Sequence, residues 1–194
     1  LGLEKALSGQ YDLILLDVML PGINGFDICN QIREHSRDQA ELIAKKIGDD
    51  LERLFAAWDL FTHSAPPIPQ RLSYAMGIHA VNNPEAFAHI QERVIAYLPK
   101  MEHNASQRNF LKALAETPLD ISEDATGMLL ETAFDWLNSP QRHIAVRVHA
   151  MQTLYEISQK IPELKQELIY TIQAHMPEGS SGFKGRGKKL LKKL

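Results

Sequence analysis

The stretch "QRHIAVRVHAMQTLYEISQKIPELKQELIYTIQAH", residues 141–175, carries the clearest pattern in this 194-residue chain. Through its first half, apolar side chains recur at intervals of three or four residues: Ala145, Val148, Ala150-Met151 and Leu154. This spacing places them on one side of a helix. Pro162 separates that helix from a second helical stretch at 163–176. The sequence therefore predicts a pair of amphipathic helices here.

The same arrangement occurs twice more upstream. A Gln-Arg pair opens a helix at each repeat, at an interval of about 35 residues: Gln70-Arg71, Gln107-Arg108 and Gln141-Arg142. A helix pair repeated at this interval is typical of an α-solenoid, in which each pair buries its apolar face against the next. We expect helices at residues 38–48, 50–63, 69–82, 84–98, 106–116, 123–138, 141–159, 163–175 and 181–193.

Residues 40–194 resemble HEAT-like α-helical repeat proteins. In addition, "PELKQEL" (162–168) and "GSSGFKGRGKKLLKKL" (179–194) resemble a small group of bacterial helical-repeat proteins. The resemblance implies an α-solenoid of antiparallel helix pairs. It also implies a non-catalytic scaffold that binds a protein partner on its concave, helix-lined surface, and it brings no enzymatic activity with it.

The N-terminal part has a different pattern, "YDLILLDVMLPGING", residues 11–25. The apolar run Leu13–Leu16 predicts a short strand buried on both faces. Turn residues follow it, and helical spacing then starts at Phe26. Asp17, Pro21 and Gly25 occur as in the central motif of response-regulator receiver domains, which residues 1–37 resemble. We therefore expect a mainly α protein: a helix-strand-helix receiver fragment in residues 1–38 and a HEAT-like repeat domain in residues 39–194.

By this resemblance Asp17 would be the phosphoacceptor. Phosphoryl transfer to a carboxylate needs Mg²⁺ held by further oxygen ligands. In receivers those ligands lie on a preceding strand, and the other phosphoryl-binding residues lie on later strands that are not found here. We expect Asp17 to be inert, and a signalling protein regulated through Asp17 is the third functional hypothesis.

A single strand leaves unpaired backbone groups on both edges. Three arrangements remain open for Leu13–Leu16: pairing with the same segment of a second copy, packing onto the first solenoid helix, or disorder. We favour a homodimer through this strand.

The C-terminal residues are strongly basic. From residue 184 onward there are six cations and no acid: Lys184, Arg186, Lys188, Lys189, Lys192 and Lys193. Removing them from the formal net charge of −3 leaves about −9 for the remainder. One interpretation is a helix capped by Ser180 or Ser181, whose lysines face solvent while its apolar residues cover the last repeat: Phe183, Leu190, Leu191 and Leu194. The other is a site for an anion, an acidic partner or nucleic acid.

Arg71, Arg108 and Arg142 should form a row along one edge of the solenoid. Each arginine either bonds to an acid or helix end of a neighbouring repeat, or belongs to a row that binds phosphates or carboxylates. The alternative function is a nucleic-acid-binding module like the helical-repeat DNA glycosylases that excise alkylated bases. Trp136 beside Asp135 is the one feature shared with that class, and the acidic body argues against it.

We expect no catalytic site, no metal and no cofactor. None of the eight histidines forms an i,i+4 pair with another, and no H-E-x-x-H motif occurs. The single cysteine, Cys29, excludes an intramolecular disulfide and favours a reducing cytoplasm. No apolar run approaches the roughly 20 residues of a membrane span.

Overall fold

The computed structural model describes residues 2–8, 11, 14–17 and 24–194. All regular structure in these residues is helical. The helices are α1 (Gly2–Leu7), α2 (Gly25–Ile47), α3 (Leu51–His63), α4 (Ile68–Asn82), α5 (Pro84–Ala88), α6 (Gln91–Tyr97), the 3₁₀ helix η1 (Leu98–Lys100), α7 (Asn104–Glu116), α8 (Glu123–Asn138), α9 (Ile144–Lys160), α10 (Leu164–His175) and α11 (Ser181–Leu191).

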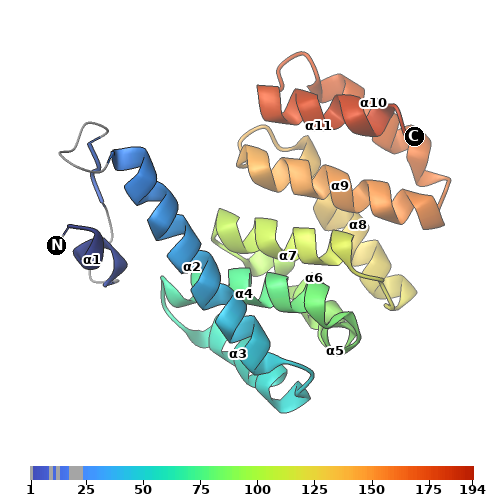
Figure 1. The fold of residues 1–194 in the computed structure, drawn as a ribbon. Coiled ribbons are helices and arrows are strands. Elements are labelled where there is room, and N and C mark those ends of the chain that lie inside the picture. The colour runs from blue at the N-terminus through green and yellow to red at the C-terminus, as the bar shows by residue number, and fades with distance from the viewer. Residues whose placement is uncertain (1, 9–10, 12–13, 18–23) are drawn as a thin grey trace.

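The helices form two layers (Figure 1). In the first layer α2, α4, α7, α9 and α11 contact one another in that order. In the second layer α3 contacts α5, α6 contacts α8, and α8 contacts α10. Each first-layer helix up to α9 is followed in the chain by a second-layer partner, which is the arrangement of an α-solenoid. The predicted solenoid of helix pairs is thus confirmed.

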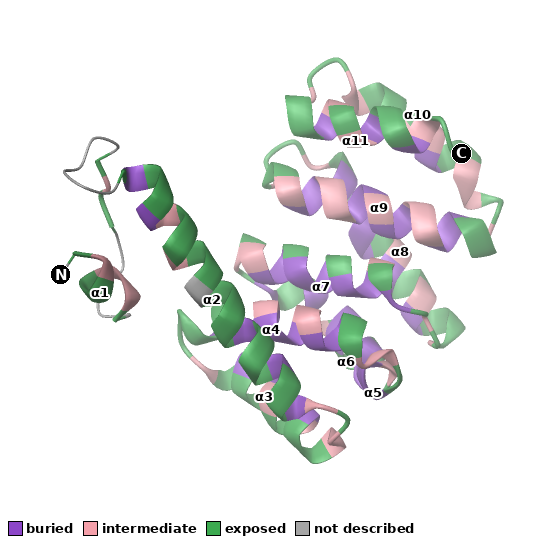
Figure 2. Ribbon diagram, in the orientation of Figure 1, coloured by how far each residue is buried: buried purple, intermediate pink, exposed green. Residues whose placement is uncertain are grey.

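One apolar core runs between the two layers, from Ile47 to Leu190 (Figure 2). Its largest fully buried side chains come from several repeats: Trp136, Phe87, Phe110 and Phe183. Burial of one such side chain contributes roughly 1.5–3 kcal/mol. Because every pair contributes to the same core, the apolar face of each pair is buried by its neighbours.

Buried polar contacts connect neighbouring first-layer helices. Asn109 Nδ2 of α7 donates to Ser73 Oγ of α4 at 3.1 Å. Thr153 Oγ1 of α9 donates to the Leu111 carbonyl of α7 at 3.1 Å. His79 Nε2 lies 2.7 Å from the carbonyl of Gly48, the glycine with φ of 56° that ends α2. These directional bonds fix the register of one helix against the next.

Most helix limits agree with the predicted ones, with three differences. The helical spacing from Phe26 and the helix expected at 38–48 are one continuous helix, α2, since no proline or glycine interrupts residues 26–47. The helix expected at 84–98 is divided into α5 and α6. The helix expected from 141 begins only at Ile144, because the His143 side chain caps it by accepting from the Ala145 N–H at 3.3 Å.

The expected strand at Leu13–Leu16 is wrong for Ile14, Leu15 and Leu16, which have no regular secondary structure; Leu13 lies outside the described residues. Leu15 is 90% exposed, so this run is not buried on both faces. A strand needs a neighbouring strand for its N–H and C=O groups, and the described residues contain none. The helix-strand-helix fragment and the strand-mediated homodimer therefore lose their basis. Nearby, α1 contacts α2, although no residue of α1 is buried.

Candidate binding groove

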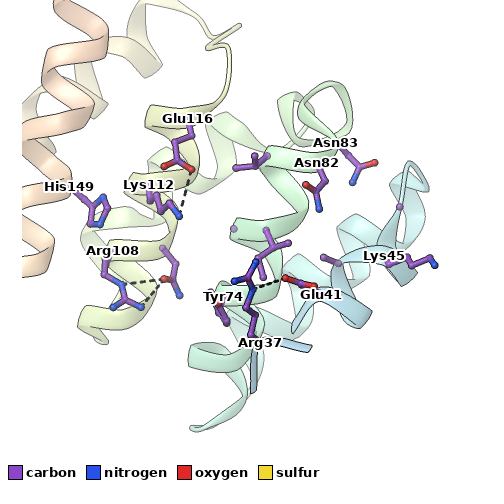
Figure 3. Close-up of a pocket in the computed structure, with 16 residues that line it drawn as sticks. Arg37, Glu41, Lys45, Tyr74, Asn82, Asn83, Arg108, Lys112, Glu116 and His149 are labelled. Carbon is purple, nitrogen blue, oxygen red and sulfur yellow. Dashed lines mark hydrogen bonds and ion pairs between the residues drawn. The ribbon is translucent and has the colours of Figure 1, made fainter. Parts of the chain in front are cut away.

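A groove of about 1050 Å³ crosses the first layer (Figure 3). It is lined by residues of α2, α4, α7 and α9 and of the turns that follow α2 and α4. Its charged and aromatic lining residues are Arg37, Glu41, Lys45, Tyr74, Arg108, Lys112, Glu116 and His149. The groove therefore joins parts of four successive repeats, and its lining carries more basic than acidic side chains.

Two helices supply the charges at regular spacing. On α2 these are Arg37, Glu41 and Lys45, and on α7 they are Arg108, Lys112 and Glu116. A four-residue interval keeps each set on one face of its helix. Arg37 Nε lies 2.7 Å from Glu41 Oε1, and this ion pair raises the pKa of Arg37. Lys112 Nζ lies 3.7 Å from Glu116 Oε2. Such exposed pairs contribute about 0–1 kcal/mol, so they can exchange partners at little cost.

Arg108 is oriented by its neighbour in the chain. Its Nη2 and Nε donate to Asn109 Oδ1 at 3.1 and 3.4 Å. Asn109 is itself buried and donates to Ser73 of α4. The Arg108 guanidinium is therefore held over the groove by a neutral amide whose own position is set by the neighbouring repeat. Its remaining N–H groups stay available to a ligand.

His149 of α9 lies at the α7 end of the groove (Figure 3). Burial, together with the charges of Arg108, Arg186 and Lys112, lowers the pKa of His149 to about 4. The imidazole is accordingly neutral at pH 7, with one nitrogen able to donate and the other able to accept. Arg186 belongs to α11, so the charges around His149 come from helices on both sides of α9.

The three arginines expected in one row have different surroundings. Arg71 is exposed on α4, and Arg108 lines the groove. Arg142 lies in the turn before α9, with its guanidinium 4.5 Å above the Trp136 ring and Nη1 3.5 Å from Gln107 Oε1. Arg142 thus contacts the preceding repeat through an amide and an aromatic ring, and not through the acid or helix end that the intramolecular interpretation expected. A row of the three arginines that binds phosphates or carboxylates stays a prediction.

Four of the six C-terminal cations, Lys184, Arg186, Lys188 and Lys189, lie on α11, and Lys192 and Lys193 directly follow it. Ser180 caps this helix by accepting from the Phe183 N–H at 3.3 Å, and Phe183 and Leu190 enter the core as predicted. Lys188 and Lys189 are exposed, and Lys184 is half-buried. Arg186 differs from the lysines: its Nη1 donates to Gln152 Oε1 of α9 at 2.8 Å. This hydrogen bond holds Arg186 against α9, and Lys193 Nζ lies 5.9 Å from the centroid of the Tyr155 ring of the same helix.

The remaining predicted residues lie elsewhere. Asp17 is exposed in the irregular segment 14–17. Trp136 is buried and covered by Arg142, so its ring faces no groove in which a base could stack. Among the residues that the structure describes, no cluster of three or more acidic, His or Cys side chains could hold a metal ion. None of the described helices combines the length and apolar character needed to cross a membrane.

The sequence analysis did not identify Lys112, Asn109, Tyr74 and His149 as groove residues. A signal for part of this set is visible in the sequence: charged residues recur every four positions at 37–45 and at 108–116. A charged stripe of this kind also occurs on ordinary solvated helix faces. Only the packing of α7 between α4 and α9 shows that these stripes border one groove.

Comparison with known proteins agrees with this architecture. The family model of the HEAT repeat domain matches residues 30–194. Three response regulators named ArlR match a 45-residue stretch that is 23% of this chain and 20% of each relative. The identities are 60% for Staphylococcus saprophyticus, 51% for Staphylococcus haemolyticus and 53% for Staphylococcus aureus. No solved structure matches the chain.

The predicted resemblances to HEAT repeats and to a receiver fragment are thus confirmed. The chain spans only about a fifth of the length of the curated relatives it matches, so their activity does not transfer as a finding. The division of the chain at residue 38 stays a prediction. α2 runs through that position, and the match to the repeat family already begins at residue 30.

Proposed function

The chain belongs to the HEAT repeat domain family, and we propose from this that it is a non-catalytic scaffold whose first-layer groove binds a protein partner. The observation that carries the proposal is the groove itself. It extends over four helices, has about 1050 Å³ of space, and combines charged rims with exposed apolar and aromatic surface. Its length along the solenoid suits an extended polypeptide segment better than a small compact ligand.

The lining chemistry supports a protein ligand. Ile78 and Val81 of α4 offer apolar contact, and Val81 is 47% exposed. Asn82 and Asn83 offer amide groups that can pair with a peptide backbone. A mixture of apolar, amide and charged groups is typical of protein interfaces. The single cysteine is in keeping with a reducing compartment, and we propose the cytoplasm as the site of action.

Site-specific photo-crosslinking in the native host tests this function. Benzoylphenylalanine replaces Asn82 in the groove in one variant and Tyr170 in the other. Tyr170 is 64% exposed on α10 and lies outside the groove. We expect one protein to crosslink from position 82 and not from position 170. That protein, once purified, should bind the wild-type chain, and added wild-type chain should lower the yield of the crosslink. Crosslinking from position 170 alone, or equal yields from both, would refute a groove-bound partner.

A further inference from the structure

Three cationic side chains from two helices surround His149. Arg108 and Lys112 of α7 line the groove with it. Arg186 reaches α9 from α11 and is fixed by Gln152, which lies three residues after His149 and therefore on the same side of α9. The sequence places Arg186 far from Arg108 along the chain, and only the stacking of α7, α9 and α11 brings the two toward one histidine.

The hydrogen-bond partners of the two arginines are neutral amides. Arg108 donates to an amide oxygen of Asn109, and Arg186 donates to an amide oxygen of Gln152. Within the described part of the chain, no carboxylate forms an ion pair with either arginine. The pKa of His149, about 4, shows the effect of burial and of this positive surrounding on a neighbouring group. Lys112 pairs with Glu116 only at 3.7 Å and on the surface.

We propose that Arg108, Lys112 and Arg186 form a binding site around His149 for the acidic side chains of a peptide segment. This inference rests on the proposed function and names the chemical class of the partner. Each arginine can donate to a glutamate or aspartate carboxylate of the peptide, and neutral His149 can donate a further hydrogen bond. The amide partners orient each guanidinium beforehand, which reduces the conformational entropy lost on binding.

An acidic peptide fits this surface better than a nucleic acid. Glu41 and Glu116 lie in the same groove as the cations, and they would repel a continuous row of phosphates. A peptide can place a carboxylate at Arg108 and Arg186 and present other residues to Glu41 and Val81. The acidic remainder of the chain also opposes a polyanion that extends beyond the cluster.

Fluorescence anisotropy tests the site with the full-length chain. The probe is a fluorescein-labelled peptide that alternates Glu and Ala, and the reference peptide alternates Gln and Ala. We expect the Glu peptide to bind more tightly than the Gln peptide. Arg108→Ala and Arg186→Ala should each weaken Glu-peptide binding about tenfold or more, since each removes a charge-assisted hydrogen bond.

Two exposed cations of first-layer helices serve as matched controls. Arg71→Ala removes an exposed arginine of α4 outside the groove, and Lys188→Ala removes an exposed lysine of α11. Both should change the affinity less than about twofold. Arg108→Lys and Arg186→Lys keep the charge, so they separate a loss of binding from a loss of folding. In addition, the His149 ring resonances should shift when the Glu peptide is added.

The proposal is overturned if Glu and Gln peptides bind equally, or if Arg71→Ala weakens binding as much as Arg108→Ala. Tighter binding of a single-stranded DNA oligonucleotide than of the Glu peptide would also overturn it. If the crosslink from position 82 forms while Glu and Gln peptides bind equally, the groove still binds a protein and only the acidic class is wrong. If no crosslink forms in the wild-type chain, the proposed function itself fails.

Discussion

Asn109 of α7 donates a hydrogen bond to Ser73 of α4 at 3.1 Å, and both side chains are buried. The Asn109 oxygen simultaneously accepts from Arg108. One amide therefore connects the packing of two repeats with the position of a groove cation. Ser73 Oγ in turn donates to the Gln70 carbonyl at 2.9 Å, which completes the connection back into α4.

Replacing Asn109 with Ala should lower the free energy of unfolding by about 1–3 kcal/mol, because Ser73 loses a buried hydrogen-bond donor. Asn82→Ala is the matched control, since Asn82 is an exposed asparagine of the same groove, and it should stay within about 0.5 kcal/mol. Urea unfolding followed by circular dichroism measures both. Equal stability of the two variants would show that the Asn109–Ser73 bond does not hold α4 against α7.

Gly187 of α11 marks a close approach between helices. A Cβ at this position would lie 2.9 Å from Met176 Sδ and 3.1 Å from Ile172 Cγ2, whereas a Cβ at Gly185 would meet nothing within 4 Å. Gly187→Val should therefore lower the free energy of unfolding by about 1–3 kcal/mol through overpacking. Gly185→Val, in the same helix, should be neutral within about 0.5 kcal/mol. Thermal unfolding of the pair tests this, and a destabilised Gly185→Val beside an unaffected Gly187→Val would contradict the packing of α11.

His149 should make stability depend on pH. Its folded-state pKa, about 4, is below the ordinary value of 6.5, so the unfolded chain binds the proton more readily. The stabilising contribution is complete above pH 6.5 and is lost progressively as pH falls from 6.5 toward 4. It amounts to roughly 1–2 kcal/mol, because solvent screens this half-buried site in part.

Urea titrations at several pH values test the contribution of His149. The wild-type stability should fall below pH 6.5, and His149→Gln should show a shallower fall. Some pH dependence will remain in the variant, since burial also lowers the pKa of His79 and His175. Identical slopes for the wild type and His149→Gln would contradict the assigned pKa.

Asp17 should not accept a phosphoryl group. The residue lies in an irregular, exposed segment and is not presented at the end of a strand, as the receiver mechanism requires. Incubation with acetyl phosphate and Mg²⁺, followed by intact-mass spectrometry, should leave the protein mass unchanged. An added phosphoryl group that disappears in Asp17→Asn would show that the N-terminal segment keeps receiver chemistry.

The helix pairs could be predicted because each leaves a local signal. Prolines separate the helices, and apolar residues such as Met151 and Leu154 recur at intervals of three or four. Met151 and Leu154 do become part of the core. The strand at Leu13–Leu16 was predicted wrongly for a related reason: an apolar run indicates a strand only if neighbouring strands exist. In this chain the described residues offer none.

The groove could be predicted only in part. Arg108 and Arg186 were identified from their sequence context, but the same context suggested Arg71, Arg142 and the exposed lysines of α11. Whether two charged side chains from different helices lie close together depends on which helices stack and on where each helix begins. For example, His143 is the N-cap of α9, so Arg142 lies in the preceding turn, where its guanidinium is stacked over the Trp136 ring. Such tertiary effects have no counterpart in the local pattern.

The most direct test of the account is a fluorine spectrum of the chain labelled with 3-fluorotyrosine, recorded while the partner identified by crosslinking is added. Tyr74 reports on the groove and Tyr170 on the outer surface of α10; Tyr→Phe variants assign their signals. The account predicts that the Tyr74 signal shifts or broadens at saturation while the Tyr170 signal stays unchanged. A shift of Tyr170 with an unchanged Tyr74 would place the partner on the other layer and contradict the central claim.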